Sequence, residues 1–382
     1  MRFIFKTNYD QDIRLFQHSG QWWSYGALLL VLVALPFVVS SYIQSQMVFV
    51  IIYAIVGVGL MVLTGFTGQG SLGHAAFLAI GAYTTAYMQA KGFGFVAYFP
   101  LAGILTAIIG AIVGFPALRL HGIYLLIATI SFGFIVEEIL ARWESVTHGN
   151  EGMRVRALDI LGWTIPRDSA EFYYLCLAVL ALTIIAVLNL MRSPTGRAFI
   201  AIRDSETAAQ SMGIDTAAYK VKAFAISAGI AGLAGSLFAH KMSFISPEMF
   251  TLLLSIEFIM VIIIGGMFGL HGAILGAMFI VMVDPLLVAL KDDFPGVVGG
   301  ILQTVTSADT ARAAEGRVAS FFSLAGLKGA LYGLIIILFI QFEPAGLYGR
   351  WLKIKAYFQL FPLYKRATFK RQKTYVKSER NR

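Results

Sequence analysis

Long hydrophobic runs, separated by short polar or glycine-rich segments, fill most of the chain. The hydrocarbon core of a bilayer is about 30 Å thick, so a helix needs about 20 mostly apolar residues to cross it. About ten runs reach or approach that length. They are residues 25–43, 47–66, 73–90, 97–118, 122–141, 170–190, 222–240, 251–269, 272–290 and 322–342. The pattern predicts an all-α polytopic membrane protein with about ten transmembrane helices.

The composition agrees with a protein whose solvent is lipid. Of the 382 residues, 58% are hydrophobic and 13% are charged, whereas about a quarter of the residues in a soluble domain are charged. The only cysteine, Cys176, excludes an intramolecular disulfide and a cysteine-based metal site. The first apolar run has no small-residue cleavage site after it and is followed by many others. We therefore interpret it as a retained span and not as a signal peptide.

Positive charge is concentrated at the two ends of the chain. The segment from Arg350 to Arg382 carries eleven Lys and Arg residues and one acid, Glu379. Basic segments next to a span stay in the cytoplasm, so an even number of spans places both termini there. We expect a cytoplasmic N-terminal segment, a transmembrane domain and a basic cytoplasmic tail. These are residues 1–24, 25–342 and 343–382.

The same count assigns sides to the long connections. The 191–221 connection falls in the cytoplasm, and the 142–168 and 291–321 connections fall outside it. An odd number of spans on each side of the 142–168 loop is typical of inverted-topology repeats, but the halves show no convincing sequence match, so the duplication stays open. The basic tail is either a topology signal or a contact for anionic lipid or a partner. Nucleic-acid binding is not expected, because no nucleic-acid fold motif accompanies the charge.

Four glycines in nine positions interrupt the sequence TGFTGQGSLGHAAF, residues 64–77, between two apolar runs. Glycine destabilises a helix interior by about 1 kcal/mol relative to alanine, so the helix is expected to break here. In lipid, irregular backbone persists only where protein or a water-filled path surrounds it. The stretch either lines a solute path or allows close helix packing through small residues. The candidate path residues are Gly65, Thr67, Gly68, Gln69, Gly70, Ser71, Gly73 and His74.

Ionisable residues are rare within the apolar runs. An acid inside a span faces a partner or a wet cavity, so Glu257 either attracts a solute ammonium group on the path or bonds to a neighbouring helix. His74 is expected to be hydrogen-bonded within the bundle rather than to the solute. Glu137 and Glu138 are expected to anchor a span end at the membrane interface. The glycines between 265 and 276 follow small-xxx-small spacing in part, which favours helix packing.

The 191–221 connection contains the capping residues of three helices. Serine or aspartate before a helix caps its first turn, and proline suits the first helical position. Glycine suits the left-handed position that ends a helix. The starts fall at Ser193–Pro194, at Asp204 or Ser205, and at Asp215, and the glycine stop falls at Gly213. The pattern predicts a compact, protruding element with a short helix in its middle.

Within this connection, Glu206, Ala208, Ala209 and Gly213 resemble the E-A-A…G pattern of the coupling loop in ABC importer permeases. In that loop, a short helix docks in a groove on the ATP-hydrolysing subunit. The small alanines permit close approach, and the glycine sets the turn behind the helix. The alternative is an ordinary interhelical loop.

Longer stretches resemble the branched-chain amino acid ABC transporter permease family, in the family's order. They are GLMVLTGFTGQGSLGHAAFLAIGAY (59–83), RDSETAAQSMGIDTAAYKVKAFAISAGIAGLAGSL (203–237), SIEFIMVIIIGGMFGLHGAILGA (255–277) and LYGLIIILFIQFEPAGLYG (331–349). The chain length and the 142–168 loop are similar to those of the larger, M-type subunit. At 147–153 the chain has THGNEGM, where the family has a more glycine-rich TGG-x-x-G. The insertion at 306–317 and the tail after Gly349 are also outside the pattern.

The resemblance implies a membrane-spanning permease subunit of an ATP-driven importer for branched-chain (hydrophobic) amino acids in a bacterial plasma (inner) membrane. A second homologous permease would complete the translocation path, and an extracytoplasmic solute-binding protein would deliver the solute. Two separate subunits would bind ATP and Mg and hydrolyse the ATP. We expect no cofactor on this chain and no enzymatic activity, because the sequence lacks the G-x-x-x-x-G-K-[ST] nucleotide loop.

Other functions stay open on the sequence alone. Similar-looking systems import urea, short amides or small aromatic acids, and fold resemblance does not settle specificity. An ion-coupled secondary transporter would work without ATPase partners, and Glu257 and Asp284 keep that option open. An integral membrane enzyme would need a clustered catalytic set, which the sequence lacks.

Overall fold

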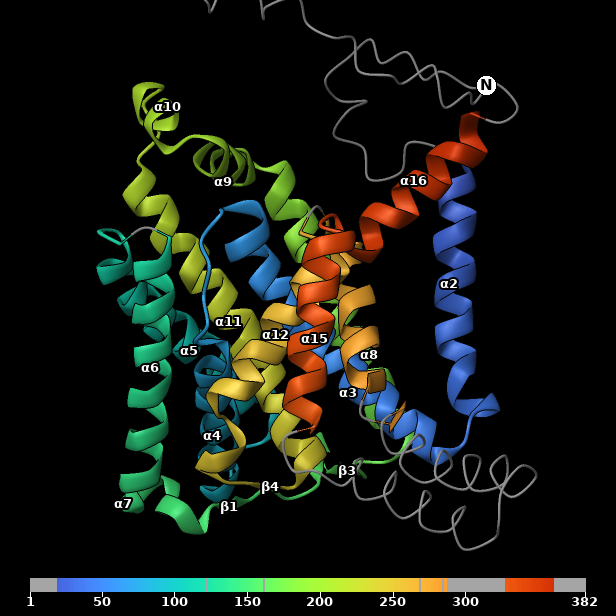
Figure 1. Ribbon diagram of the computed structural model, residues 1–382. Helices are drawn as coiled ribbons and strands as arrows, with labels where there is room; N and C mark the ends of the chain where they lie inside the picture. The colour runs from blue at the N-terminus through green and yellow to red at the C-terminus, as the bar shows by residue number, and fades with distance from the viewer. Residues whose placement is uncertain are drawn as a thin grey trace, which may run out of the picture.

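The computed structural model describes residues 19–360, except 121, 161, 268, 284 and 287–326. These residues form a bundle of long helices (Figure 1). The first half contains α2 (Ser19–Val38), α3 (Ser41–Leu60), the π-helix η1 (Met61–Phe66), α4 (His74–Ala90), α5 (Phe95–Ala117) and α6 (Ile123–Arg142). The second half contains α8 (Ala170–Arg192), α9 (Pro194–Asp204), α10 (Glu206–Ser211), α11 (Thr216–Met242), α12 (Leu252–Gly265), the helix Leu270–Val283, α15 (Leu327–Phe342) and α16 (Gly346–Leu360).

Every apolar run that the sequence predicts to span the membrane contains a helix. In the described part of the chain, 6 helices are long and apolar enough to cross a bilayer, and Trp23–Val38 and Leu270–Val283 are shorter apolar helices. Many large apolar side chains on α2, α5 and α6 are exposed, which marks surfaces that face lipid or another protein. The prediction of an all-α membrane protein is confirmed at this level, and the number of spans stays a prediction.

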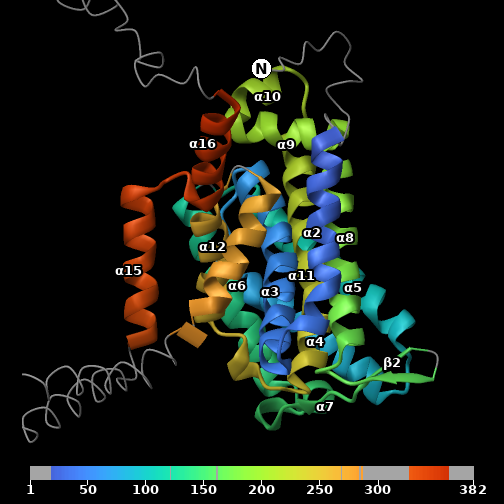
Figure 2. The ribbon, with the colours of Figure 1, turned by 90° about the vertical axis from the view of Figure 1, so that its right-hand side faces the viewer.

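The helix α11 lies at the centre of the bundle and packs against α3, α4 and α5 (Figures 1 and 2). Small residues make this packing close: a Cβ at Gly81 of α4 would collide with the Gly232 backbone of α11. Close approach of backbones is a common way for membrane helices to associate without a hydrophobic driving force. Gly265 and Gly276 leave no room for a Cβ either, so the packing role predicted for the glycines between 265 and 276 is confirmed.

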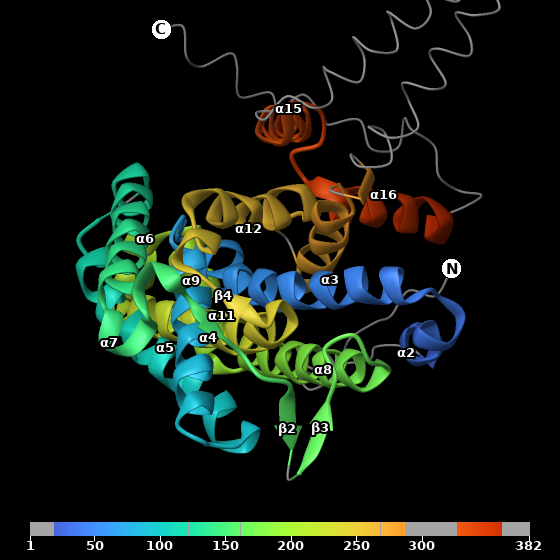
Figure 3. The same ribbon diagram turned by 90° about the horizontal axis from the view of Figure 1, so that it is seen from below.

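The two connections predicted on opposite sides of the membrane lie at opposite ends of the bundle, with α9 and α10 at one end and the 142–168 segment at the other (Figure 1). The latter segment is folded, and it adds short strands that the all-α prediction does not include. It contains α7 (Glu144–Thr147), the 3₁₀ helix η2 (Gly149–Glu151), β1 (Met153–Arg154), β2 (Leu158–Ile160) and β3 (Trp163–Ile165). The antiparallel β2–β3 hairpin projects from the bundle (Figure 3). β1 pairs with β4 (Phe244–Ile245), just before the 3₁₀ helix η3 (Pro247–Met249).

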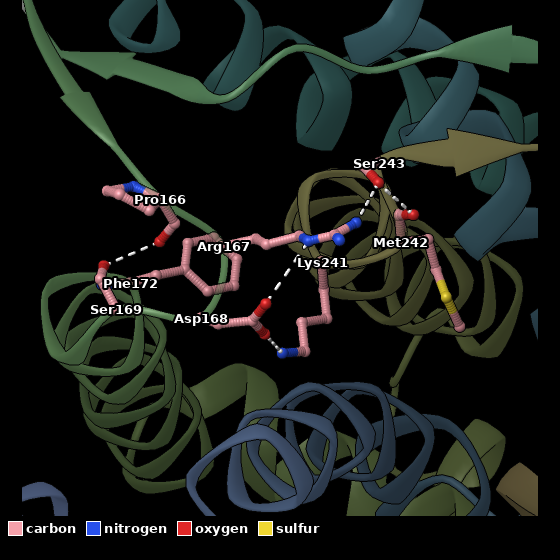
Figure 4. Close-up of polar contacts among 8 residues, drawn as sticks. All are labelled: Pro166, Arg167, Asp168, Ser169, Phe172, Lys241, Met242 and Ser243. Atoms are coloured by element: carbon pink, nitrogen blue, oxygen red, sulfur yellow. Dashed lines mark hydrogen bonds and ion pairs between the residues drawn. The ribbon is translucent and has the colours of Figure 1, made fainter. Parts of the chain in front are cut away.

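Polar contacts fasten the end of the 142–168 segment to the end of α11 (Figure 4). Lys241 Nζ donates to Asp168 Oδ1 at 2.7 Å; the lysine side chain is 3% exposed and the aspartate side chain 54%. This hydrogen bond is the main reason why the pKa of Asp168 is lowered. Beside it, Arg167 Nη1 donates to Ser243 Oγ at 2.5 Å. Segments far apart in sequence are therefore joined at this end of the bundle.

Several predicted segments lie outside the described residues. They are residues 1–18, Asp284, the 291–321 loop with its 306–317 insertion, and the tail after residue 360. The first part of the predicted tail is helical, because α16 begins at Gly346. Glu343, just before α16, accepts from Arg350 and Lys353 at 2.9 and 2.8 Å.

Candidate translocation path and coupling element

The glycine stretch breaks the helix, as its composition predicts. The π-helix η1 ends at Phe66, residues 67–73 are irregular, and α4 starts at His74. Gly68 has a φ of +75°, a left-handed conformation that residues with a Cβ rarely adopt. The irregular segment runs alongside neighbouring helices before α4 begins (Figure 1), so α4 starts inside the bundle.

Threonine side chains satisfy part of the freed backbone. Thr64 Oγ1 donates to the Gln69 carbonyl at 3.0 Å, and Thr67 Oγ1 donates to the Val62 carbonyl at 2.8 Å. The Gln69 backbone N–H donates to the Leu63 carbonyl at 3.0 Å. Backbone groups in a hydrocarbon environment need such partners, so these contacts allow the break to lie within the membrane.

Hydroxyl groups from other helices bind one backbone N–H group just before α4 and one in its first turn. Leu72 N donates to Thr129 Oγ1 on α6 at 3.0 Å, and Ala75 N donates to Ser255 Oγ on α12, also at 3.0 Å. The first N–H groups of a helix have no partner within it. α12 therefore caps α4 from outside its own sequence, and α6 binds the irregular segment just before it.

His74 completes this arrangement. It is fully buried, with Nε2 2.8 Å from Ser227 Oγ on α11 and Nδ1 3.0 Å from Ser71 Oγ. Ser227 lies near the middle of α11, so the start of α4 is near the middle of the bundle. Both ring nitrogens have protein partners, as expected for a histidine hydrogen-bonded within the bundle. We call Ser71, His74, Thr129, Ser227 and Ser255 the α4-start cluster.

Three members of the α4-start cluster, Thr129, Ser227 and Ser255, are not among the residues that the sequence singles out. Each is a single hydroxyl residue in a long apolar run, which is common and has no diagnostic spacing. Only the mid-bundle start of α4 gives these hydroxyls their role. Sequence reasoning had no signal for that start beyond the glycine stretch itself.

Among the remaining residues of the stretch, three glycines have packing contacts, and one polar side chain is not explained by packing. Gly73 lies against the Thr129 carbonyl with no room for a Cβ, Gly65 lies close to Met61 Sδ and the Met267 carbonyl, and a Cβ at Gly70 would meet the end of the Leu126 side chain. These three contacts support the packing interpretation. Gln69 differs: it is 6% exposed, and neither polar atom of its side chain has a hydrogen-bond partner among the described residues.

Glu257 lies apart from the α4-start cluster. It is half-buried on α12, and its Oε2 accepts from Tyr53 Oη on α3 at 2.9 Å. This contact provides the neighbouring-helix partner that one of the two sequence interpretations requires.

A cavity of about 810 Å³ opens at the α7 end of the bundle. Glu137, Glu138, Asn150 and Glu248 contribute its polar lining. None of the path residues predicted from the sequence lines it. Glu138 pairs with Arg142, whereas Glu137 also borders a narrower space beside Leu72, Ala76 and Ser255. Glu137 therefore lies between the open cavity and the start of α4.

The helix starts predicted in the 191–221 connection are confirmed. α9 begins at Pro194, and Ser205 Oγ accepts from Ala208 N at 3.3 Å at the start of α10. Gly213 has a φ of +81°, and Asp215 Oδ1 accepts from Ala218 N at 3.1 Å at the start of α11. The capping residues thus define a short helix held between two turns, which we call the α9–α10 element.

The four coupling residues predicted from the sequence do not share one face. Ala208 and Gly213 are exposed, but Ala209 is 3% exposed and packs against its own chain. Glu206 is half-buried, and its Oε1 accepts from the buried Lys220 of α11 at 2.5 Å. Met212, which the sequence pattern did not single out, is 84% exposed at the end of α10. The outer face of α10 is therefore formed by residues such as Ala208 and Met212.

The chain is similar in sequence to known transport proteins. The family model for the permease component of branched-chain amino acid transport systems matches residues 42–340. The permease protein LivM of the high-affinity branched-chain amino acid transport system is 36% identical over 300 residues, in Salmonella typhimurium and in Escherichia coli, covering 72% of this chain and 71% of each relative. The autoinducer 2 import system permease protein LsrC of Salmonella typhi is 33% identical over 118 residues, 29% of this chain and 34% of that relative. No solved structure matches the chain significantly.

The family model extends from the start of α3 almost to the end of α15, so it includes the helix break, the α4-start cluster and the α9–α10 element. The match with LivM covers more than two thirds of both chains. This chain belongs to the permease component family of branched-chain amino acid transport systems.

Proposed function

We propose that this chain is a permease subunit of an ATP-driven importer of branched-chain amino acids in a bacterial plasma membrane. A second permease completes the path, two ATPase subunits bind ATP and Mg, and an extracytoplasmic binding protein delivers the solute. The observation that carries the proposal is the α9–α10 element, a capped short helix with exposed Ala208 and Met212 at one end of the bundle. A protruding, capped short helix whose outer residues are not used in packing its own chain is free to contact a partner.

The same proposal includes ten spans and two cytoplasmic termini. The 142–168 segment and the α9–α10 element lie at opposite ends of the bundle (Figure 1), as an odd number of crossings between them requires. α16 begins the basic tail at the α9 end (Figure 2), which agrees with positive charge in the cytoplasm.

The proposed path runs from the cavity at the α7 end to the α4-start cluster. A zwitterionic amino acid needs groups for its ammonium and its carboxylate beside apolar wall for its side chain. Glu137 and Glu248 line the cavity and suit the ammonium. The N-terminal end of α4 carries the positive end of the helix dipole, whose field favours a nearby carboxylate although the Ala75 N–H already donates to Ser255. Gln69, with two unpartnered polar atoms, is the path residue whose chemistry is best explained by contact with water or solute.

The test is to reconstitute the purified complex in vesicles and to supply leucine at concentrations that saturate the binding protein. We expect leucine uptake that requires ATP, the ATPase subunits and the binding protein. Competition with urea, a short amide or a small aromatic acid distinguishes the other solutes that similar systems import. Uptake by this chain alone under a proton or sodium gradient would instead establish a secondary transporter.

A further inference from the structure

One side chain joins the α9–α10 element to the broken helix. Arg203, the penultimate residue of α9, donates from Nη1 to the Gly65 carbonyl at 3.1 Å, across 138 positions of sequence. Its Nε and Nη2 donate to Asp204 Oδ1 at 3.1 and 3.0 Å. The guanidinium therefore bridges the end of α9 and the end of η1.

The stem of Arg203 makes a second contact with the same segment. A Cβ added at Gly68 would lie 3.1 Å from Arg203 Cγ and 3.4 Å from its Cα. Gly68 has a φ of +75°, and glycine changes such a backbone conformation at little cost. Arg203 thus contacts the last turn before the irregular segment and the glycine at which the chain changes direction.

The hydrogen bond from Arg203 replaces one that a helix would supply. The last carbonyls of a helix lack intrahelical donors. The carbonyls of Leu63 and Thr64 accept from the backbone N–H groups of Gln69 and Gly68, and the next carbonyl, that of Gly65, accepts from Arg203. A guanidinium presents several donors in a rigid fork, so one side chain can hold Asp204 and Gly65 at a fixed separation.

We propose that Arg203 is the positioning residue through which displacement of the α9–α10 element reaches the translocation path, an inference that rests on the proposed function. Ser205, the N-cap of α10, is two residues from Arg203. The ion pair of Glu206 with Lys220 at 2.5 Å ties α10 to the start of α11. When an ATPase subunit moves α10, the end of α9 moves with it, and Arg203 moves the Gly65 carbonyl relative to the α4-start cluster.

The first experiment separates transmission from assembly. Arg203→Met keeps most of the stem and removes every donor, and Arg203→Lys keeps a charge with a single donating group. Arg197→Met is the matched control on the same helix, where Nη1 donates to the Arg192 carbonyl at 3.3 Å. In the purified full complex, we measure ATPase subunits per permease, basal hydrolysis, hydrolysis stimulated by loaded binding protein, and uptake.

We expect Arg203→Met to assemble and to keep basal hydrolysis, while stimulated hydrolysis and uptake fall about fivefold or more, the scale of a typical allosteric coupling. Arg203→Lys recovers part of the loss, and Arg197→Met behaves like the parent. If Arg203→Met does not assemble, Arg203→Lys carries the same test. Loss of assembly in both variants, or stimulation and uptake within about twofold of the parent, overturns the inference.

The second experiment measures the accessibility of a residue at the helix break. The only native cysteine, Cys176, is fully buried, so Thr64→Cys adds one half-buried thiol beside the break. We measure its maleimide labelling rate in the nucleotide-free and the ATP–vanadate-trapped complex. The rate is expected to differ between the two states in the Thr64→Cys parent and to be equal when Arg203→Met is added. A difference that persists with Arg203→Met overturns the inference, whereas a complex with the unsubstituted chain that lacks solute-stimulated hydrolysis contradicts the proposed function instead.

Discussion

Gln69 shows how one side chain separates the two interpretations of the glycine stretch. The glycines around it are explained by close packing, because a Cβ at Gly73 would collide with the α6 backbone and one at Gly70 would displace the Leu126 side chain. Packing does not explain a buried amide with no partner for its oxygen or nitrogen among the described residues. A buried polar group left unpaired destabilises a protein by about 1–3 kcal/mol. Its presence is explained if the amide contacts water or solute during transport.

Gln69→Leu is therefore predicted to impair transport without impairing stability. The free energy of unfolding should be unchanged or rise by about 1 kcal/mol, because an unpaired amide is removed, while uptake falls about tenfold for a lost contact to a charged solute. Gln44→Leu is the matched control, because Gln44 is a buried amide on α3 whose nitrogen also lacks a partner. Thermal unfolding in detergent and uptake in vesicles provide the measurements. Equal uptake by the two variants would favour packing alone.

The ion pair of Lys241 with Asp168 predicts a pH dependence. The pKa of Asp168 is lowered in the folded protein, so its contribution to stability is complete above the pKa of an unfolded aspartate, about 3.9. That contribution is lost as the pH falls from there through the lowered pKa. Asp168→Asn should lower the unfolding free energy at pH 7 by about 1–2 kcal/mol, a value reduced because Asp168 is half-exposed. At acidic pH, the stability of the Asp168→Asn variant should approach that of the parent.

The double variant Lys241→Met with Asp168→Asn provides the control for this pair. Removing only the aspartate leaves a buried ammonium group without its partner, whereas removing both leaves an apolar side chain in that place. The double variant should recover most of the lost stability at pH 7 in a thermal unfolding assay. No recovery would mean that the aspartate acts through Arg167 and not through Lys241.

At the scale of elements, the local sequence predicts more of the α9–α10 element than of the path. The starts of α10 and α11 are encoded by capping residues next to them, so Asp215 and Ser205, one of two candidates with Asp204, were correct predictions, as was Gly213. Ser193 was wrong as a cap of α9, because its hydroxyl donates to the Leu190 carbonyl and the helix starts at Pro194 without a side-chain cap. The outward face was not predictable, because the burial of Ala209 depends on how α10 folds back on its own chain. The hydroxyls of Thr129 and Ser255, which bind the backbone just before α4 and in its first turn, come from other helices, and no local pattern encodes them.

The exposed face of α10 predicts which substitutions separate docking from folding. Met212→Asp and Ala208→Arg should reduce co-purification of the ATPase subunits, since they place charge or bulk on the outer face, and should leave thermal stability unchanged. Ala209→Arg should lower the thermal stability of the permease itself, because Ala209 is buried in its own chain. Gly213→Val should also lower the free energy of unfolding, by about 1–2 kcal/mol, because it places a branched residue at a φ of +81°. Undiminished ATPase binding by Met212→Asp and Ala208→Arg would exclude this face as the docking site.

At the scale of the whole molecule, hydropathy predicts the order of helices, because each span must satisfy its own backbone in lipid. It does not predict the small β-structures at the α7 end. β1 and β4 have two residues each and pair across a long sequence separation, so neither carries a strand pattern of its own. The break before α4 was predicted from its glycines, but its depth in the bundle follows from contacts with α6, α11 and α12.

The positions of the 142–168 segment and the α9–α10 element at opposite ends of the bundle predict the outcome of a labelling experiment. Single cysteines replacing Asn150 and Ser211 should react with an impermeant maleimide from opposite sides of the membrane, Asn150→Cys from outside and Ser211→Cys from the cytoplasm. A reporter fused after Arg382 should be cytoplasmic. The buried Cys176 serves as the internal control for unwanted labelling. Reaction of both introduced thiols from the same side would contradict ten spans with 142–168 outside.

The start of α4 also has a consequence for biogenesis. Its partners Thr129, Ser227 and Ser255 lie 57, 153 and 180 positions further along the chain than the groups they bind. The ribosome therefore releases α4 long before its capping hydroxyls exist, and a bare polar helix end is expensive in hydrocarbon. During translation this end must be sheltered by the insertion machinery. A chain that ends before Ser255 lacks the last of these partners, so the start of α4 is fully hydrogen-bonded only after α12 has been synthesised.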